Sequence, residues 1–213
     1  MTVTKILDSV VNWCKTNICD KIELKAPVGD TPGRKEPIDH SVKYVHPAAF
    51  ALFVPGKDRL PPNVTAPIPA ICVQLMEGHD QIVERKRAVT VRLCLSAWNP
   101  GTQSGELFFP HVDTSRDIPR KYTQGDGERQ FYDRNFDGWR DVWNFVDKTL
   151  RAVEDADSIG EGLLLDRSEG VKYGPFQEDG TIWDYYPYWH SWVSFKLEGE
   201  LVTAIPHNYN ELL

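Results

Sequence analysis

The stretch Val171–Leu197, VKYGPFQEDGTIWDYYPYWHSWVSFKL, decides the fold and holds nine of the chain's 24 aromatic residues. From Tyr188 onward its residues alternate between two faces, as the period of two in a β-strand requires. One face begins with Trp189 and the other with Tyr188 and Trp192, so both begin aromatic. A strand that is apolar on both sides is normally covered by a helix on one side and by a neighbouring subunit or a long loop on the other. The stretch therefore predicts a strand that is covered on both faces, and association between copies.

Two earlier segments carry the same strand pattern. Ala88–Trp98 is predicted to be a long strand, with Val89, Val91, Leu93, Leu95 and Ala97 on a single face. Ile71–Leu75 is predicted to be its partner strand, and a hairpin through Glu77–Asp80 is expected to join the two. Asn99-Pro100-Gly101 ends the longer strand, because proline removes a ladder donor and glycine relaxes the turn.

Two segments have apolar residues at helical spacing, residues 4–18 and DGWRDVWNFVDKTLRAVEDA, in which Asp137 is the expected N-cap. Their apolar faces comprise Ile6, Leu7, Val10, Val11, Trp13, Cys14 and Ile18 in the first helix and Trp139, Val142, Trp143, Val146, Leu150 and Val153 in the second. The order of helix, two strands, helix and further strands predicts an α+β fold. We expect a mainly antiparallel β-sheet with two helices packed on one face, in a single domain that spans residues 1–213.

Two long loop arms interrupt this body, at about 27–70 and 99–135. The first holds nine of the 15 prolines, and the second is rich in Gly, Asp, Gln and Arg. Each contains an apolar part, Tyr44–Val54 in the first and Leu107-Phe108-Phe109 in the second. An apolar part within a polar loop is typical of a partner contact. We therefore expect Tyr44–Val54 to dock on its own sheet or on a neighbour, and the second arm to contact a partner.

The composition limits the class of protein. The formal charge of −7 does not favour a protein that wraps nucleic acid, because such proteins carry a basic surface. The four cysteines form no CxxC pair and lie in apolar segments, which predicts reduced, buried thiols in an intracellular environment. Neither a leader peptide nor an apolar run of about 18 residues is present, so we expect no membrane association and folding in the cytoplasm.

Catalytic and metal-binding motifs receive little support. Asp133–Gly138 matches the first half of a calcium loop, but Asn144 stands where a bidentate Glu is needed, so a polar turn is favoured. The six histidines lack zinc-ligand spacing, and no serine lies in a nucleophile motif. Glu178, Asp179 and Asp184 could be drawn as a glycosidase pair, but acidic residues around a glycine more simply predict a turn. The sequence predicts no enzyme, no metal and no cofactor.

Five segments together resemble the tail terminator proteins of tailed bacteriophages and related phage-tail-like particles. They are the first helix, IPAICVQL, VTVRLCLSAWNPG, DGWRDVWNFVDKTLRAVEDA and VKYGPFQEDGTIWDYYPYWHSWVSFKLEG. The likeness covers most of the chain in element order. It implies a structural protein that forms a ring, usually a homohexamer, on the last ring of the tail tube, stops tube polymerisation and offers a face to the head-side connector or stopper protein.

The resemblance also implies a place and partners. The protein would be assembled in the host cytoplasm and reside in the virion, at the head-proximal end of the tail, with DNA only as cargo passing through the lumen. Surfaces expected to contact partners comprise Phe50, Phe53, Leu107, Phe108, Phe109, Tyr188 and Trp192. Two alternatives stay open. One is a head-tail connector or another tail completion protein, and the other is a carbohydrate-binding module of a baseplate, since exposed aromatic side chains also bind sugars.

Overall fold

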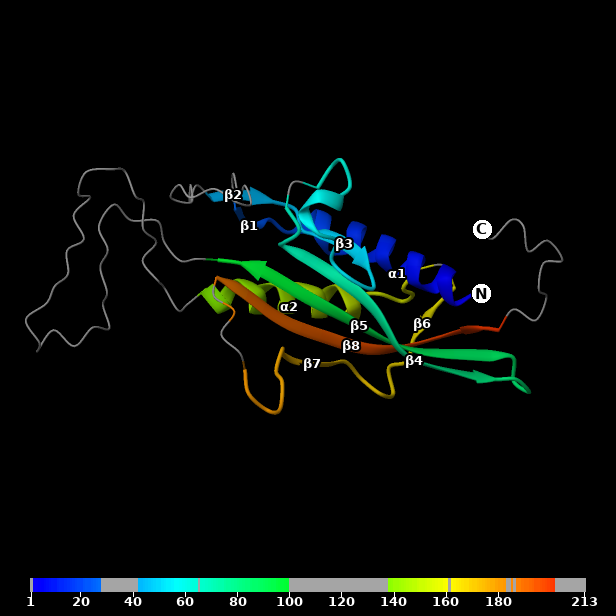
Figure 1. The fold of residues 1–213 in the computed structure, drawn as a ribbon. Coiled ribbons are helices and arrows are strands. Elements are labelled where there is room, and N and C mark those ends of the chain that lie inside the picture. The colour runs from blue at the N-terminus through cyan, green and yellow to red at the C-terminus, as the bar shows by residue number, and fades with distance from the viewer. Residues whose placement is uncertain are drawn as a thin grey trace, which may run out of the picture.

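The computed structural model describes residues 2–27, 42–64, 66–99, 138–160, 162–182, 185 and 187–201. Its main sheet has six strands in the order β3-β4-β5-β8-β6, and β7 also pairs with β8 (Figure 1). The strand bounds are β3 Ala48–Ala51, β4 Ala70–Gln81, β5 Lys86–Trp98, β6 Leu164–Leu165, β7 Lys172–Pro175 and β8 Tyr188–Glu200. All pairings in this sheet are antiparallel except that of β3 with β4. The predicted α+β class with a mainly antiparallel sheet is confirmed.

The long strands β5 and β8 form the centre of the sheet because their apolar residues alternate over 13 residues each. Val89, Val91, Leu93, Leu95 and Ala97 of β5 are all buried, as predicted. Their neighbours on β8 include Val193, Phe195 and Leu197, which are buried on the same side. Strand β8 is therefore an inner strand, with β5 on one side of it and β6 and β7 on the other.

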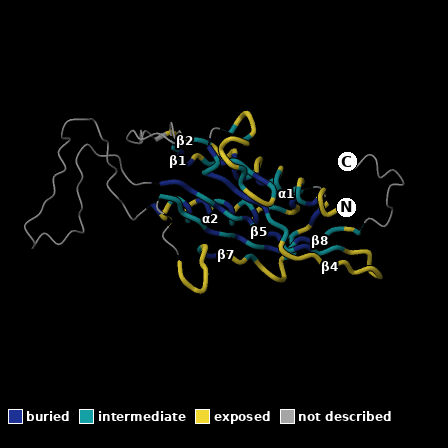
Figure 2. The backbone as a smooth tube through the Cα atoms, viewed as in Figure 1, coloured by how far each residue is buried: buried dark blue, intermediate teal, exposed yellow. Residues whose placement is uncertain are grey.

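Two helices, α1 Val3–Asn17 and α2 Trp139–Glu154, cover the same face of this sheet (Figures 1 and 2). The core between the layers joins Ile6, Val10 and Cys14 of α1, Phe145 and Val146 of α2, and the inward residues of β4, β5 and β8. Helix α1 follows the prediction closely. It begins after Thr2, whose hydroxyl accepts a hydrogen bond from Lys5 N at 3.3 Å, as an N-cap side chain does.

Helix α2 is rotated relative to the predicted apolar face. Its buried residues are Val142, Phe145, Val146, Thr149 and Val153. Val142, Val146 and Val153 are buried as predicted, but Trp139 is 41% exposed, so its predicted place on the apolar face is wrong. Trp143 is half-buried at the margin of the core, where its ring meets that of Tyr173 edge-on at 6.4 Å. Thr149 can occupy the core because its hydroxyl donates to Phe145 O at 2.8 Å.

The start of α2 also differs from the prediction. The N-cap is Gly138 and not Asp137, and no side chain caps the helix there. A Cβ on Gly138 would lie 2.5 Å from Trp189 Nε1 and 2.6 Å from Asn99 O, so only glycine fits this close approach. Asn99 holds the first turn from outside, since its Nδ2 donates to Asp141 Oδ2 at 2.7 Å. The end of β5 thereby fixes the beginning of α2.

The hairpin between β4 and β5 is longer than expected. Glu77–Asp80 lies within β4 and pairs with β5, so the predicted turn at these residues is wrong. The chain turns instead at residues 82–85, with Arg85 in the left-handed region at φ 54°. A register shift between Leu75 and Glu77 allows the strand to continue. Beyond Val73, the outer edge of β4 has no described strand beside it, because β3 pairs only with Ala70–Val73.

The described residues of the first predicted arm include three strands. Leu24–Pro27 (β1) and Val42–Val45 (β2) form a separate antiparallel pair, and Ala48–Ala51 (β3) joins the main sheet. Two short 3₁₀ helices, η1 Cys19–Lys21 and η2 Lys57–Arg59, flank these strands. Of the Tyr44–Val54 segment, which is expected to dock on its own sheet or on a neighbour, Ala48–Ala51 docks on the main sheet as β3. Residues 28–41 and the whole second arm at 99–135, except Asn99, lie outside the described residues.

A tight turn follows β7, as predicted for the acidic residues around Gly180. Glu178 and Thr181 exchange backbone hydrogen bonds of 3.0 and 2.9 Å, and Asp179 and Gly180 between them have positive φ values. Positive φ at both central residues characterises a type I′ hairpin turn. Glu178 and Asp179 therefore serve as turn residues here.

Candidate interaction surface

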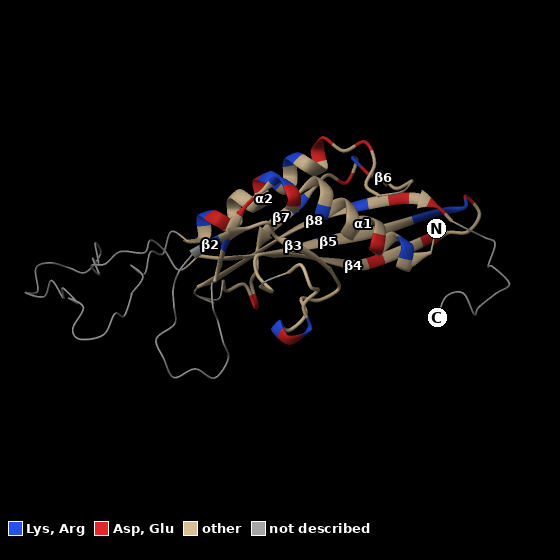
Figure 3. Cartoon of the chain, turned by 90° about the horizontal axis from the view of Figure 1, so that it is seen from above, with Lys and Arg blue, Asp and Glu red and all other residues tan. Residues whose placement is uncertain are grey.

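The face of the sheet opposite the helices carries polar and aromatic side chains. We call it the open face, because no helix among the described residues covers it (Figure 1). Cross-strand neighbours place its members in rows, such as Arg92 beside Ser194 and Lys172, and Cys94 beside Trp192 and Gly174. Charged residues of both signs also lie along the outer side of α2 (Figure 3). The open face is thus the broad surface that the two-layer packing leaves for other contacts.

Trp192 is engaged within the open face. Its Nε1 donates to Pro175 O at 3.0 Å, and its ring lies against Gly174, where a Cβ would come within 3.1 Å of it. The guanidinium carbon of Arg92 lies 5.3 Å from the ring centroid, a cation–π distance. Arg92 Nε is buried without a hydrogen-bond partner among the described residues. Trp192 therefore stabilises the β7–β8 edge and orients Arg92.

A second cluster surrounds His190 on the same strand. Ser96 Oγ and His190 Nδ1 are 2.9 Å apart across the β5–β8 ladder. The rings of Phe176 and Tyr185 approach the imidazole edge-on at 6.3 and 5.7 Å. Burial lowers the pKa of His190, because the imidazolium is disfavoured away from water. A serine and a histidine alone make no hydrolytic site, and no described carboxylate completes one here.

The His190 cluster predicts a loss of stability in mild acid. The folded state holds the imidazole neutral, whereas the unfolded chain binds a proton near the ordinary pKa of 6.5. The free energy of unfolding should therefore fall as the pH drops below about 6.5. Urea unfolding at a series of pH values between about 8 and 5 measures this effect. His190→Gln should flatten the dependence in that range, and an unchanged slope in the variant would assign it to another group.

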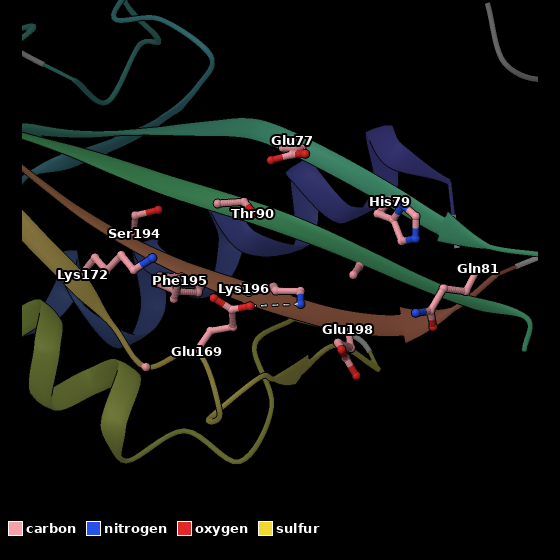
Figure 4. Close-up of a pocket in the computed structure, with 12 residues that line it drawn as sticks. Glu77, His79, Gln81, Thr90, Glu169, Lys172, Ser194, Phe195, Lys196 and Glu198 are labelled. Carbon is pink, nitrogen blue, oxygen red and sulfur yellow. Dashed lines mark ion pairs between the residues drawn. The ribbon is translucent and has the colours of Figure 1, made fainter.

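A groove runs along the open face where the β4–β5 hairpin leaves the body. Its volume is about 450 Å³. Figure 4 shows its side chains, which come from β4 (Glu77, His79, Gln81), β5 (Ala88, Thr90), β8 (Ser194, Phe195, Lys196, Glu198) and the segment Glu169–Lys172. We call this cavity the groove. It is open to solvent and lined by charged and polar groups, so it suits a polar or charged ligand surface better than an apolar small molecule.

Ion pairs organise one wall of the groove. Lys196 Nζ lies 3.2 Å from Asp166 Oδ2 and 3.7 Å from Glu169 Oε1. The hydrogen bond and charge of Asp166 raise the pKa of Lys196, and hydrogen bonds from Ser168 and Lys196 lower the pKa of Asp166. Glu77 and Glu198 form no ion pair with a described residue, although Glu198 contributes to the raised pKa of Lys196. The groove therefore has a net acidic character.

The predicted contact residues separate into four groups. Phe53 is 69% exposed and remains available to a partner, whereas Phe50 is 7% exposed and packed within the fold, so its assignment to an interface is corrected. Tyr188 and Trp192 are half-buried on β8, and the latter is held by Pro175 and Arg92. Leu107, Phe108 and Phe109 lie outside the described residues.

The most exposed apolar side chains were not predicted. Ile82 is 77% exposed and Val83 is 97% exposed, both at the turn of the β4–β5 hairpin. Their signal in the sequence is weak, because a single Ile-Val pair before Glu84-Arg85-Lys86-Arg87 also fits the interior of a strand. The role of Arg92 was also not predicted, because strand alternation predicts the face on which Arg92 lies but not its stacking on Trp192.

The described residues offer no further chemistry of a recognised kind. They contain no group of three or more His, Cys, Asp or Glu side chains arranged to hold a metal ion. Cys14, Cys19 and Cys72 are buried free thiols, as predicted, and Cys94 is half-buried. Burial raises the pKa of Cys19 to about 12 and that of Cys72 to about 11, which keeps both thiols protonated and unreactive. Among the described helices, none is long and apolar enough to cross a membrane.

The sequence matches no protein-family model and no curated protein.

Proposed function

We propose that this protein is a structural tail terminator, which forms a ring on the end of a tail tube, stops tube polymerisation and offers a docking face for head joining. The observation that carries the proposal is the one-sided packing of the sheet. Both described helices lie on one face, while the other presents Arg92, Trp192 and a charged groove. Tryptophan and arginine are enriched where proteins bind one another.

The distribution of exposed apolar surface supports the same function. Phe53, Ile82 and Val83 are among the most exposed large apolar residues of the described chain, with Phe53 just after β3 and the other two together at the turn of the β4–β5 hairpin. An assembly subunit needs separate contact surfaces for its own copies and for its partners. The segments that resemble tail terminators contribute to both helices, α1 and α2, and to the strands β4, β5, β7 and β8 of the main sheet.

Two other functions are consistent with parts of this picture. A head-tail connector or another tail completion protein would use the same kind of surfaces. A carbohydrate-binding module would use the aromatic cluster of Phe176, Tyr185 and His190 as a sugar platform. The close approach of these rings favours packing against one another over stacking on a sugar, which is why the ring-forming function is preferred.

Electron microscopy of the purified full chain separates these functions. A terminator should appear as closed rings of one size and of tube-like diameter. A sugar-binding module should instead be a monodisperse monomer that binds glycans on an array. Monomers without glycan binding would remove both of these functions for the isolated chain.

A further inference from the structure

The turn of the β4–β5 hairpin projects from the sheet and carries two exposed apolar residues. We call this turn the apex and define it as Ile82–Lys86. It extends past the helices at one end of the sheet (Figures 1 and 2). Ile82 and Val83 expose 77% and 97% of their surface there. Turns favour Gly, Asn and Asp, so two β-branched apolar residues give the apex no local advantage. Their presence points to a contact made outside this fold.

The apex is held in place by the strands beneath it. Asp80 and Arg87 face each other across the hairpin and are joined by two hydrogen bonds, Nε to Oδ1 at 2.7 Å and a terminal guanidinium nitrogen to Oδ2 at 2.6 Å. Strand β8 runs beside β5 to Lys86, and Leu201 N donates to Arg85 O at 2.8 Å. Three hydrogen-bonded strands therefore hold the apex extended. A turn that is already ordered loses little conformational entropy when it docks.

The charges of the apex oppose those of the groove. Arg85 and Lys86 form no ion pair with a described residue, and Glu84 is the one acidic residue among the five of the apex. The groove contributes Glu77, Glu169 and Glu198 against Lys172 and Lys196, and Asp166 already pairs with Lys196. A cationic apex on a chain of net charge −7 is therefore attracted to another copy.

We propose that the apex of one copy docks in the groove of a second copy of this chain. The proposal rests on the proposed function for its choice of a second copy as occupant. The apex cannot enter its own groove, because β4 and β5 form that groove and hold the apex beyond its end. Ile82 and Val83 then cover Ala88 and the stem of Thr90, while Arg85 and Lys86 meet Glu77 and Glu198. Since apex and groove are different surfaces, the contact can repeat from copy to copy until a ring closes.

Charge reversal on each side tests the contact. The first variant carries Arg85→Glu and Lys86→Glu, and the second carries Glu77→Lys and Glu198→Lys. In each variant alone, apex and groove have like charge, and self-association should weaken by roughly tenfold or more. In an equimolar mixture every apex meets a groove of opposite charge, so assembly should return. Sedimentation velocity of wild type, each variant and the mixture measures this, with circular dichroism to confirm folding.

Two further variants keep the test sharp. Ile82→Ser with Val83→Ser should weaken assembly, while Leu52→Ser, which changes a 51% exposed residue elsewhere, should leave it unchanged. If Glu198→Lys disturbs folding through Lys196, Glu77→Lys alone replaces the second variant. Variants that assemble like wild type, or a mixture that fails to assemble, would overturn the proposal.

The outcome is separable from the proposed function. Rings that depend on the apex but leave tube length unchanged would keep this contact and remove the terminator function. Rings that still form in all of these variants would instead remove this contact and keep the terminator function. Strictly monomeric wild type would overturn the contact. Apex-dependent binding of that monomer to phosphatidylserine vesicles would assign the apex to a lipid surface instead.

Discussion

Phe145→Ala should lower the free energy of unfolding by about 3 to 5 kcal/mol, the usual cost of emptying a buried aromatic site. Phe145 is 0% exposed and lies in the core between α2 and the sheet. The helix and the long strands around it are anchored by their neighbours, so the cavity cannot close by a simple collapse. Chemical denaturation with tryptophan fluorescence measures the change.

Trp139→Ala is the matched control, because it removes a larger ring from the same helix. Trp139 is 41% exposed, and its described ring contact is with Arg140 at 4.8 Å. Its loss should cost under about 1 kcal/mol, as surface substitutions usually do. If Trp139→Ala cost more than Phe145→Ala, the helix would face the sheet by its tryptophans and the orientation of α2 described above would be wrong.

Gly160→Ala should destabilise the fold by about 2 to 5 kcal/mol, through backbone strain and overlap together. Gly160 has φ 71°, a left-handed conformation that disfavours residues with a side chain. A Cβ there would lie 2.6 Å from Ser9 Cβ and 3.2 Å from the backbone carbonyl carbon of Ser9 on α1. Because these are parts of a packed helix, α1 would have to move away from the turn after α2. Thermal unfolding measures the loss.

Gly162→Ala separates the cost of backbone strain from the cost of steric overlap. Gly162 has φ 72°, nearly the same as Gly160, but a Cβ on it would meet nothing within 4 Å. Its substitution should therefore cost only the conformational strain, about 1 to 2 kcal/mol. Equal losses in the two variants would show that α1 does not approach Gly160 closely, and that the packing of α1 on this turn is misplaced.

The strands of the core were predictable because a period of two is visible in a single strand. Val89, Val91 and Leu93 alternate with polar residues, and each turned out buried. Helix α2 was harder, because it carries two overlapping apolar stripes. Thr149 is a polar residue type, so the sequence does not indicate that it is buried. It can be buried because its hydroxyl donates a hydrogen bond to Phe145 O within the helix. Val142, Val146 and Val153 belong both to the predicted stripe and to the core, and the tryptophans shifted the predicted stripe toward the margin of the helix–sheet contact.

The interaction surface was less accessible to prediction because it depends on chain geometry. Gly78 and Asp80 suggested a turn, but after a register shift at Leu75 the strand continues past them to Gln81. Phe50 and Phe53 look equivalent in the sequence, yet one is 7% exposed and the other 69%. Phe50 lies on β3 and aligns with Cys72 of β4, whereas Phe53 follows the end of that strand, and residue types alone do not specify this difference.

Growth of tail tubes in the presence of this protein tests its proposed function most directly. The tail-tube subunit of the same particle would be polymerised alone and with the purified chain, and tube lengths would be measured by electron microscopy. The proposed function predicts shorter tubes that stop growing and carry an extra ring at one end. Tubes of unchanged length, with no added ring, would contradict it.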